Sequence, residues 1–316
     1  MVQHGKVWSN FRVLLNKQKE RLNVVMRLLI LSDFHCGHVV GLTPPAWWRT
    51  DCTGMVGGNQ IIAKQRAQQE ERWNWYANEI DKVKKEGAFD YLCMNGDAID
   101  GSSARIGGAE KMEVLQVQVD MAEVSIKYAI TPKKTKGVFM SSGTNYHTRS
   151  SDGAVDMELA LRRQVDTFIK AQYSPIPYLR IGGDKNPFIL KCRHHTSRGT
   201  IRSGGAIPGA ARQMVDSILA SKLMGDPDVD LIALSHVHEA SFVQMFQANG
   251  RPLYVLTTPA LQGRGSEYGM KMCNGVVHFG FVVLEIEQSA NGGWDISYEP
   301  HIIQLVSDRV EIFDLK

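Results

Sequence analysis

The sequence predicts an α/β sandwich, in which two β-sheets pack face to face and helices cover the outside. Through the first two-thirds of the chain, short apolar runs alternate with segments of helical period, which is typical of strands joined by helices. In the last third, strand patterns follow one another without helices, which predicts a β-meander. A length of 316 residues and an apolar content of 43% suffice for one large core, so a single domain over residues 1–316 is the simplest division.

The first strand is expected at residues 28–31, where the run Leu-Leu-Ile-Leu stops abruptly at Ser32. The pattern of residues 9–23 before it predicts a short amphipathic helix or an extension outside the core, and residues 1–24 as a whole are the expected N-terminal extension. Residues 37–59 after it, rich in Gly, Pro and Trp, predict a long ordered loop that is either functional or an exposed insertion held by its own aromatics. Helices are expected at residues 60–86, 109–130, 154–169 and 210–224. Further strands are expected at residues 89–94, 138–140, 177–181, 188–193, 230–234, 241–246, 253–257, 276–287, 296–298 and 301–305.

Composition excludes several classes of protein. The net charge of +3 is too small to indicate a dedicated nucleic-acid-binding domain. Five scattered cysteines without a CxxC pair argue against a disulfide framework and against a structural zinc module. The start of the chain lacks the pattern of a secretory signal, and no apolar run reaches the length of a membrane span. We therefore expect a cytoplasmic protein with reduced thiols and no membrane partner.

Residues that can bind metals gather where the strands of the alternating region end. Asp33 and His35 follow the first strand with one residue between them, so in an extended segment both side chains leave on the same face. Alternatively, Asp33 only caps the next helix and His35 is a loop histidine. The later strand ends carry Asp97, then Asn145 and His147, then His194 and His195, and finally His236 and His238. Because ligands bind at this edge of open α/β sheets, the series predicts a binding site there.

The residue types indicate which metals such a site would take. Carboxylate oxygen and imidazole nitrogen together suit Mn²⁺, iron, Zn²⁺ or Ni²⁺ rather than a metal selected by thiolates. Two ions close together need a shared anionic ligand, and a single aspartate between two groups of ligands can supply it. Such a pair generates a hydroxide nucleophile near neutral pH and screens the charge of a phosphoryl transition state.

Taken in order, these motifs resemble those of the calcineurin-like metallophosphoesterase superfamily, whose pattern runs D-x-H, G-D, G-N-H-D/E, H and G-H-x-H. The chain has DFH at 33–35, GD at 96–97, GTNYH at 143–147, HH at 194–195 and SHVH at 235–238. The resemblance covers roughly residues 27–260. The segment CG at 36–37, followed by GLTPP at 41–45, looks more narrowly like phage- and prophage-encoded members.

The resemblance implies a four-layer α/β/β/α sandwich of two mixed β-sheets flanked by helices. It also implies two divalent or trivalent transition-metal ions, with Mn as the first choice and Fe, Zn or Ni as alternatives. The ligands implied for the first ion are Asp33, His35 and His238. The ligands implied for the second ion are Asn145, His194 and His236. Asp97 would bridge the two ions in the catalytic centre, and His147 would contact a phosphoryl oxygen or protonate the leaving group.

The chain departs from the family pattern at two points. Tyr146 separates Asn145 from His147, so either Thr144 or Asn145 can occupy the ligand position. Ser235 replaces the usual glycine before H-x-H, a mild change at a tight turn. Of the HH pair, the resemblance favours the first histidine as the ligand, which leaves the second as a neighbouring or surface residue.

Three residues are candidates for contact with the substrate. Arg198 and Arg202 lie in a basic, glycine-containing loop that can hold phosphate, although a merely solvated loop explains the same composition. Tyr146 can stack on a base or can pack against its own protein.

We therefore expect a dinuclear metal-dependent phosphoesterase in which a metal-bound hydroxide attacks phosphorus in line. Phosphodiesters, including DNA, RNA or nucleotides, are the preferred substrates because a phage-like relative would meet them. A phosphomonoesterase acting on protein or small molecules is the alternative enzyme. A scaffold that has kept the sandwich and lost its metals is the alternative without catalysis, and the changed spacing before His147 is the feature that favours it. Nothing in the sequence indicates the oligomeric state.

Overall fold

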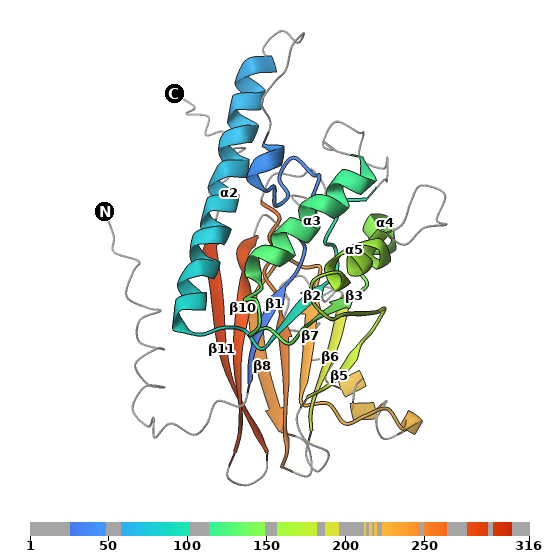
Figure 1. Cartoon of the computed structure of the whole chain (residues 1–316). Coiled ribbons are helices and arrows are strands. Elements are labelled where there is room, and N and C mark those ends of the chain that lie inside the picture. The colour runs from blue at the N-terminus through green and yellow to red at the C-terminus, as the bar shows by residue number, and fades with distance from the viewer. Residues whose placement is uncertain are drawn as a thin grey trace, which may run out of the picture.

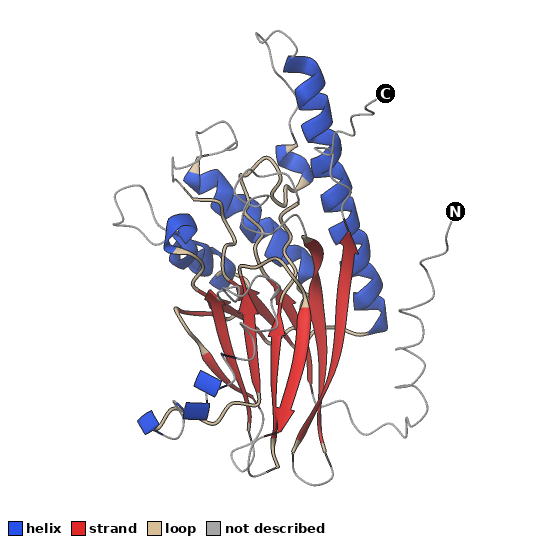
Figure 2. Cartoon of the chain, turned by 180° about the vertical axis from the view of Figure 1, so that it is seen from behind, coloured by secondary structure: helices blue, strands red, loops and turns tan. Residues whose placement is uncertain are grey.

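The computed structural model describes residues 26–48, 58–101, 114–148, 157–181, 187–195, 212, 215–216, 218–219, 223–246, 250–263, 277–289 and 293–304. These residues form two mixed β-sheets that pack face to face, with helices against the outer face of the larger sheet (Figure 1 and Figure 2). The α/β sandwich that the sequence predicts is thus confirmed. None of the helices within these ranges combines the length and the apolar character needed to cross a membrane.

The six-stranded sheet has the order β11-β10-β1-β2-β3-β4. Its parallel strands are β1 (Met26–Leu31), β2 (Tyr91–Asn95), β3 (Gly137–Ser141) and β4 (Ala171–Ser174). Antiparallel to them, β10 (His278–Gln288) pairs with β1, and β11 (Trp294–Gln304) pairs with β10. The carboxyl ends of the four parallel strands therefore meet at one edge.

The five-stranded sheet has the order β5-β6-β7-β9-β8. Its three central strands, β6 (Phe188–His195), β7 (Leu231–Ser235) and β9 (Pro252–Thr257), are parallel. Its edge strands, β5 (Tyr178–Ile181) and β8 (Ser241–Phe246), are antiparallel to their neighbours.

Helices supply the outer layers of the sandwich. Against the six-stranded sheet pack α2 (Gly58–Glu86), α3 (Leu115–Ala129) and α5 (Met157–Asp166), and two short helices, η1 (Pro45–Trp47) and α4 (Asn145–Thr148), lie in the loops. On the far side, the described residues 212, 215–216, 218–219 and 223–224 are helical, and Ile218 packs against the outer face of the five-stranded sheet.

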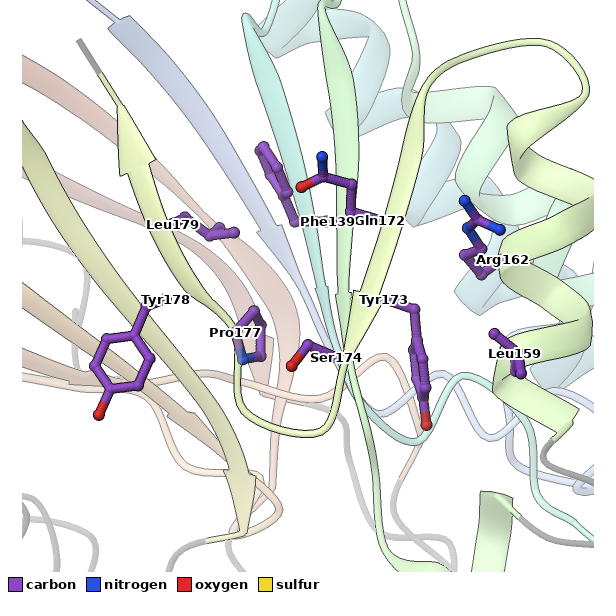
Figure 3. A pocket seen from close by; sticks show the side chains of 9 residues that line it. All are labelled: Phe139, Leu159, Arg162, Gln172, Tyr173, Ser174, Pro177, Tyr178 and Leu179. Atoms are coloured by element: carbon purple, nitrogen blue, oxygen red, sulfur yellow. The ribbon is translucent and has the colours of Figure 1, made fainter. Parts of the chain in front are cut away.

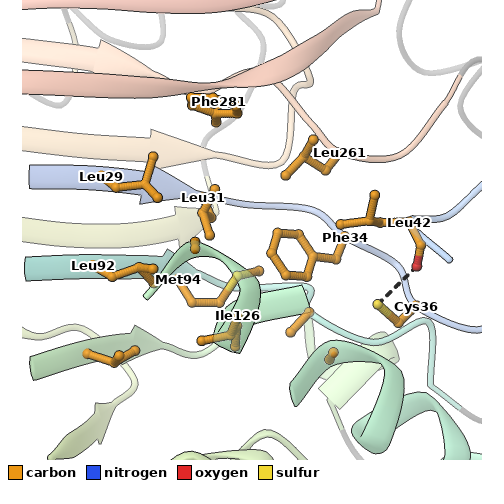
Figure 4. Close-up of a cluster of buried hydrophobic side chains, with 14 of the residues drawn as sticks. Leu29, Leu31, Phe34, Cys36, Leu42, Leu92, Met94, Ile126, Leu261 and Phe281 are labelled. Atoms are coloured by element: carbon orange, nitrogen blue, oxygen red, sulfur yellow. Dashed lines mark hydrogen bonds between the residues drawn. The ribbon is translucent and has the colours of Figure 1, made fainter. Parts of the chain in front are cut away.

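Strand β1 shows how the core is divided. Leu28 and Ile30 face the second sheet, where they pack with residues such as Leu231. Leu29 and Leu31 face the opposite way, into the layer of helices (Figure 4). Because both faces of a parallel strand are covered, its sequence is continuously apolar rather than alternating. This is why the run at residues 28–31 could be recognised before any other element.

The structure differs from the sequence-based expectations in three places. Strand β4 was not expected, because its sequence Ala-Gln-Tyr-Ser is short and half polar, as suits an edge strand. Residues 296–298 and 301–305 belong largely to the single strand β11. The expected β-meander is wrong, since β8 and β9 join the five-stranded sheet while β10 and β11 join the other. Strand periodicity specifies a buried face but does not say which sheet a strand enters.

Some expected segments fall wholly or partly outside the described residues. These are the extension 1–24, residues 49–57 of the long loop, the first residues of the helices expected at 109–130 and 154–169, and much of the helix expected at 210–224. Residues 276 and 305, at the ends of two expected strands, also lie outside them. In the described part of the loop, residues 37–44 are buried, so this part is packed into the protein.

Leu29→Ala is expected to lower the free energy of unfolding by about 2–5 kcal/mol, because the Leu29 side chain is fully buried on the face of β1 that the helices cover. Val124→Ala, on the exposed side of α3, should change it by less than about 0.5 kcal/mol. Urea unfolding followed by circular dichroism measures both. Similar losses in the two variants would contradict the assignment of this core.

Candidate metal centre

The predicted strand-end residues of both sheets meet at one edge of the sandwich. The six-stranded sheet contributes Asp33, His35 and Asp97, which follow β1 and β2. The five-stranded sheet contributes His194, His236 and His238, from the end of β6 and the loop after β7. The cluster is therefore assembled across the interface between the sheets.

The backbone at these strand ends turns into the left-handed region. Among the residues that the structure describes, six non-glycine residues have positive φ, and five of them belong to the cluster. These five angles are 51° at Asp33, 44° at His35, 50° at Asp97, 75° at His236 and 56° at His238. Asp and His tolerate this region better than most residues, yet it still costs on the order of 1–3 kcal/mol per residue. Strain gathered in one place is typical of a functional site.

The first group of ligands consists of Asp33, His35 and His238, whose ligand atoms lie within 4.8 Å of one another. All three side chains are buried, and His238 Nε2 lies 3.2 Å from Asp33 Oδ1. Burial would raise the pKa of Asp33, but His194 and His238 outweigh it and hold that pKa well below its usual value. Burial would lower the pKa of His35, but the neighbouring carboxylates of Asp100 and Asp33 raise it to about 10.

The second group consists of Asp97, His194 and His236, whose ligand atoms meet the same limit of 4.8 Å. His194 Nε2 lies 2.9 Å from Asp97 Oδ2. Burial would lower the pKa of His194, but the charges of Asp97 and Asp33 raise it to about 9. Burial, together with repulsion from His194, lowers the pKa of His236 to about 4. A neutral imidazole offers the lone pair that a metal ion needs.

Asp97 belongs to the second group and also reaches the first. Its Oδ2 atom is 2.9 Å from His194 Nε2 and 3.9 Å from His35 Nε2, so one carboxylate contacts a member of each group. A third set of mutually close atoms, from His35, Asp97 and His147, overlaps both groups. Burial would raise the pKa of Asp97, but His194 and His147 outweigh it and hold that pKa well below its usual value. This is the position that a bridging carboxylate requires.

The cluster offers donor atoms that could hold a metal ion. The buried Nε2 atoms of His35 and His194 make no well-aligned hydrogen bond within the described part of the chain. Both nitrogens lie within 3.9 Å of both Asp33 Oδ1 and Asp97 Oδ2, so they face the same space. Buried carboxylates and orphaned ring nitrogens are costly unless a cation compensates them. The oxygen and nitrogen donors suit Mn²⁺, Fe²⁺, Zn²⁺ or Ni²⁺.

Hydrogen bonds on the far side of the imidazole rings fix their orientation. His194 Nδ1 donates to the Asn95 carbonyl at 2.7 Å, and His147 Nδ1 donates to the Asp100 carbonyl at the same distance. His35 Nδ1 lies 3.3 Å from Asp100 Oδ1. These contacts engage Nδ1 of each ring and leave Nε2 for the cluster, which is how proteins usually orient metal-binding histidines.

The sequence left Thr144 and Asn145 as alternatives for one ligand position, and it is Thr144 that lies beside Asp97. Its N–H donates to Asp97 Oδ1 at 2.6 Å, and its hydroxyl donates to Asp97 Oδ2 at 3.2 Å. The hydroxyl also lies 3.4 Å from His236 Nδ1. Asn145, the other candidate, begins α4 and has an exposed side chain. Of the two, Thr144 is thus the one in contact with the second group.

His147 stands beside the cluster, with its ring edge-on to that of His35 and the ring centroids 4.5 Å apart. Burial lowers the pKa of His147 despite the opposing attraction of Asp97. Tyr146 lies against His147, with ring centroids 4.8 Å apart, and is partly exposed.

The remaining predicted residues lie at the margin of the site or beyond the described ranges. His195 is exposed and stacks on His236, with ring centroids 4.5 Å apart. The proposed phosphate contacts Arg198 and Arg202 lie outside the described residues.

Ser235 joins a polar network beneath the cluster. Its hydroxyl oxygen accepts a hydrogen bond from Asn95 Nδ2 at 2.6 Å and another from the Thr258 hydroxyl at 2.8 Å. Asn95 Oδ1 in turn accepts from the Ser141 hydroxyl at 2.6 Å. Because Asn95 ends β2 and Ser235 ends β7, the network links the two sheets. Ser235 remains within its strand, so the family's glycine is not needed here.

Two buried acids behind the ligands were missed by the sequence analysis. Asp100 contacts His35, and its position three residues after Asp97 was a signal that could have been used. Glu158 lies in α5, where its carboxylate accepts hydrogen bonds from backbone N–H groups of the loops after β2 and β3. Burial, reinforced by Asp97, raises the pKa of Glu158 to about 8. No local pattern marks Glu158, because acids on helices usually face solvent.

A separate cavity of about 490 Å³ lies at the edge where β4 approaches β5 (Figure 3). Its lining includes no member of the two ligand groups. The lining side chains are Phe139, Leu159, Arg162, Gln172, Tyr173, Ser174, Pro177, Tyr178 and Leu179.

No protein-family model and no curated protein matches the sequence. Among solved structures, the chain is similar to the NAD nucleotidase of Haemophilus influenzae, with a TM-score of 0.42, 14% sequence identity and coverage of 88% of this chain. It spans about half of that protein, 56% of its length. It is also similar to a metallophosphoesterase of Sphaerobacter thermophilus, with a TM-score of 0.32, 12% identity and coverage of 87% of this chain and 88% of that one.

With TM-scores of 0.42 and 0.32, the likenesses concern the fold alone and carry no argument about the activity of this chain.

Mn²⁺ is expected to raise the melting temperature of protein freed of metal by a chelator, because the ions compensate buried charge. Free Mn²⁺ at 100 times the dissociation constant stabilises by about 2.7 kcal/mol per site. Asp97→Asn should lose most of this gain, whereas Asp81→Asn, at an exposed carboxylate on α2, should keep it. Differential scanning calorimetry measures the shift, and an equal gain in the Asp97 variant would contradict the shared position of this residue.

Proposed function

We propose that this chain is a dinuclear metal-dependent phosphoesterase that hydrolyses phosphodiester bonds of nucleotides or nucleic acid. The main support is the pair of buried ligand groups on either side of Asp97. A second support is that the orphaned Nε2 atoms of His35 and His194 face one space between two carboxylates.

Each ligand group would hold one of the two ions. Asp33, His35 and His238 would hold the first ion, and His194 and His236 the second, with Asp97 between them. Thr144 would stand where the resemblance places Asn145. When bound, two such ions lower the pKa of water and screen the negative charge of phosphoryl oxygens.

His147 is placed to act on the substrate. The Asp100 carbonyl holds its Nδ1–H, which leaves Nε2 to contact a phosphoryl oxygen or to pass a proton to the leaving group. Because burial lowers its pKa, the ring favours the neutral form until a negative phosphate arrives beside it and favours the protonated form.

The choice of a nucleotide or nucleic-acid diester rests on the sequence resemblance. Tyr146 is partly exposed beside His147 and offers a ring on which a base can stack. Arg198 and Arg202 follow β6 in the chain and would hold further phosphates.

Asp97→Asn is expected to lower kcat on bis-p-nitrophenyl phosphate with Mn²⁺ by at least about 100-fold, because the variant loses the shared anionic ligand. Asp81→Asn should hydrolyse it like the wild type. A panel of p-nitrophenyl phosphate, cyclic nucleotides and single- and double-stranded DNA then separates diesterase from monoesterase action. If the wild type binds no Mn²⁺ and cleaves none of these, the protein is a scaffold and the proposal is wrong.

His147→Ala is expected to slow hydrolysis of an ester with a poor leaving group more than that of one with a good leaving group. General acid assistance is worth about 10²–10⁴-fold and matters most when the leaving group is basic. Phenyl and p-nitrophenyl diesters compared at saturating substrate measure the difference. His195→Ala, at the exposed neighbour of His194, should affect both esters equally, and an equal effect of His147→Ala would refute its role as an acid.

A further inference from the structure

Glu158 is a buried acid that none of the roles above explains. It lies in the first turn of α5 and is 1% exposed. Its Oε2 atom accepts the Gly143 N–H at 2.8 Å, and its Oε1 atom accepts the Ala98 N–H at 3.4 Å. One side chain thus joins the loop after β2 to the loop after β3.

The two residues that donate these hydrogen bonds are next in the chain to Asp97 and Thr144. Ala98 directly follows Asp97, and Gly143 directly precedes Thr144. Thr144 in turn donates both its N–H and its hydroxyl to Asp97. The Glu158 carboxylate therefore closes a ring of contacts that runs through both loops and holds Asp97 within it.

The two loops approach each other too closely to move independently. A Cβ atom at Gly143 would lie 2.1 Å from Asp97 Oδ1 and 2.3 Å from Asp97 N, so only glycine fits there. Any displacement of Gly143 toward Asp97 would consequently move the carboxylate.

Helix α5, which carries Glu158, is held in place by contacts on two sides. Leu161 and Val165 anchor the helix in the core. Its other side is tied to the start of β4, because Arg162 Nε donates to the Ala171 carbonyl at 2.9 Å and the Ala171 N–H donates to Asp166 Oδ1 at 2.8 Å. The position of the carboxylate is thus set by the fold and not by the loops that it holds.

We infer that Glu158 is a positioning residue, which fixes Asp97 and Thr144 for metal binding by holding the loops after β2 and β3 together. An apolar residue at this site would avoid the cost of burying an acid but would leave two buried N–H groups without an acceptor. This inference rests on the proposed dinuclear site, and it concerns metal affinity before any catalysis.

Two variants of Glu158 separate positioning from simple packing. Glu158→Ala removes both acceptors, whereas Glu158→Gln keeps the shape and presents one acceptor and one amide that cannot accept. Leu161→Ala is the matched control, because it weakens the packing of the same helix and leaves both hydrogen bonds of Glu158 to the loops in place. Isothermal titration with Mn²⁺ gives stoichiometry and affinity, and calorimetric melting of the metal-free proteins gives stability.

Glu158→Ala is expected to bind Mn²⁺ about 10- to 100-fold more weakly than the wild type, as is usual for residues that support ligands. Glu158→Gln, which keeps one acceptor, is expected to lose less affinity. Leu161→Ala is expected to melt at a lower temperature and to keep the wild-type affinity. The inference is overturned if Glu158→Ala binds Mn²⁺ within about twofold of the wild type, or if Leu161→Ala loses as much affinity as Glu158→Ala. If the wild type itself binds no Mn²⁺, the proposed function fails first, and the two failures are thereby distinguished.

Discussion

The central constraint on this structure is that two carboxylates, Asp33 and Asp97, are buried at the strand ends and need compensation. Asp33 and Asp97 are buried at the carboxyl ends of adjacent parallel strands, where an unpaired carboxylate is costly. Four histidines lie close enough to lower the pKa of one or both acids, but two ring nitrogens in the cluster keep no well-aligned partner. The protein alone therefore leaves the balance of charge and hydrogen bonding incomplete, and transition-metal cations are the partners that both donor types accept.

This requirement explains why the site lies across two sheets. A single parallel sheet would bring its strand ends into one row, whereas two facing sheets surround a space from both sides. The apolar interface formed by residues such as Ile30 and Leu256 holds the sheets together below the site. Nearer to it, the bond between Asn95 and Ser235 makes the same connection with polar groups. Core packing and polar bonds thus fix the distance between the two halves of the cluster.

Much of this arrangement could be predicted from the sequence, because the main signals are local. Residues 28–31 form a continuous apolar run that ends in Asp and His, and the later strands end in the same residue types. What could not be predicted depends on contacts between distant segments. The contact of Thr144 with Asp97 depends on how two loops meet, and Glu158 is buried only because α5 lies over those loops. Likewise, the division of the last four strands between the sheets follows from packing and not from their period.

The left-handed backbone at five cluster residues restricts how this centre can change its chemistry. Aspartate and histidine are at once ligand types and side chains that this conformation accepts. Glutamate or cysteine would meet a conformational penalty as well as a new preference for metals. The backbone conformation therefore restricts which ligands can replace these residues and so opposes a change of metal by ligand substitution. Substitution of a neighbouring residue such as Thr144, whose φ is not among the positive ones, meets no such restriction.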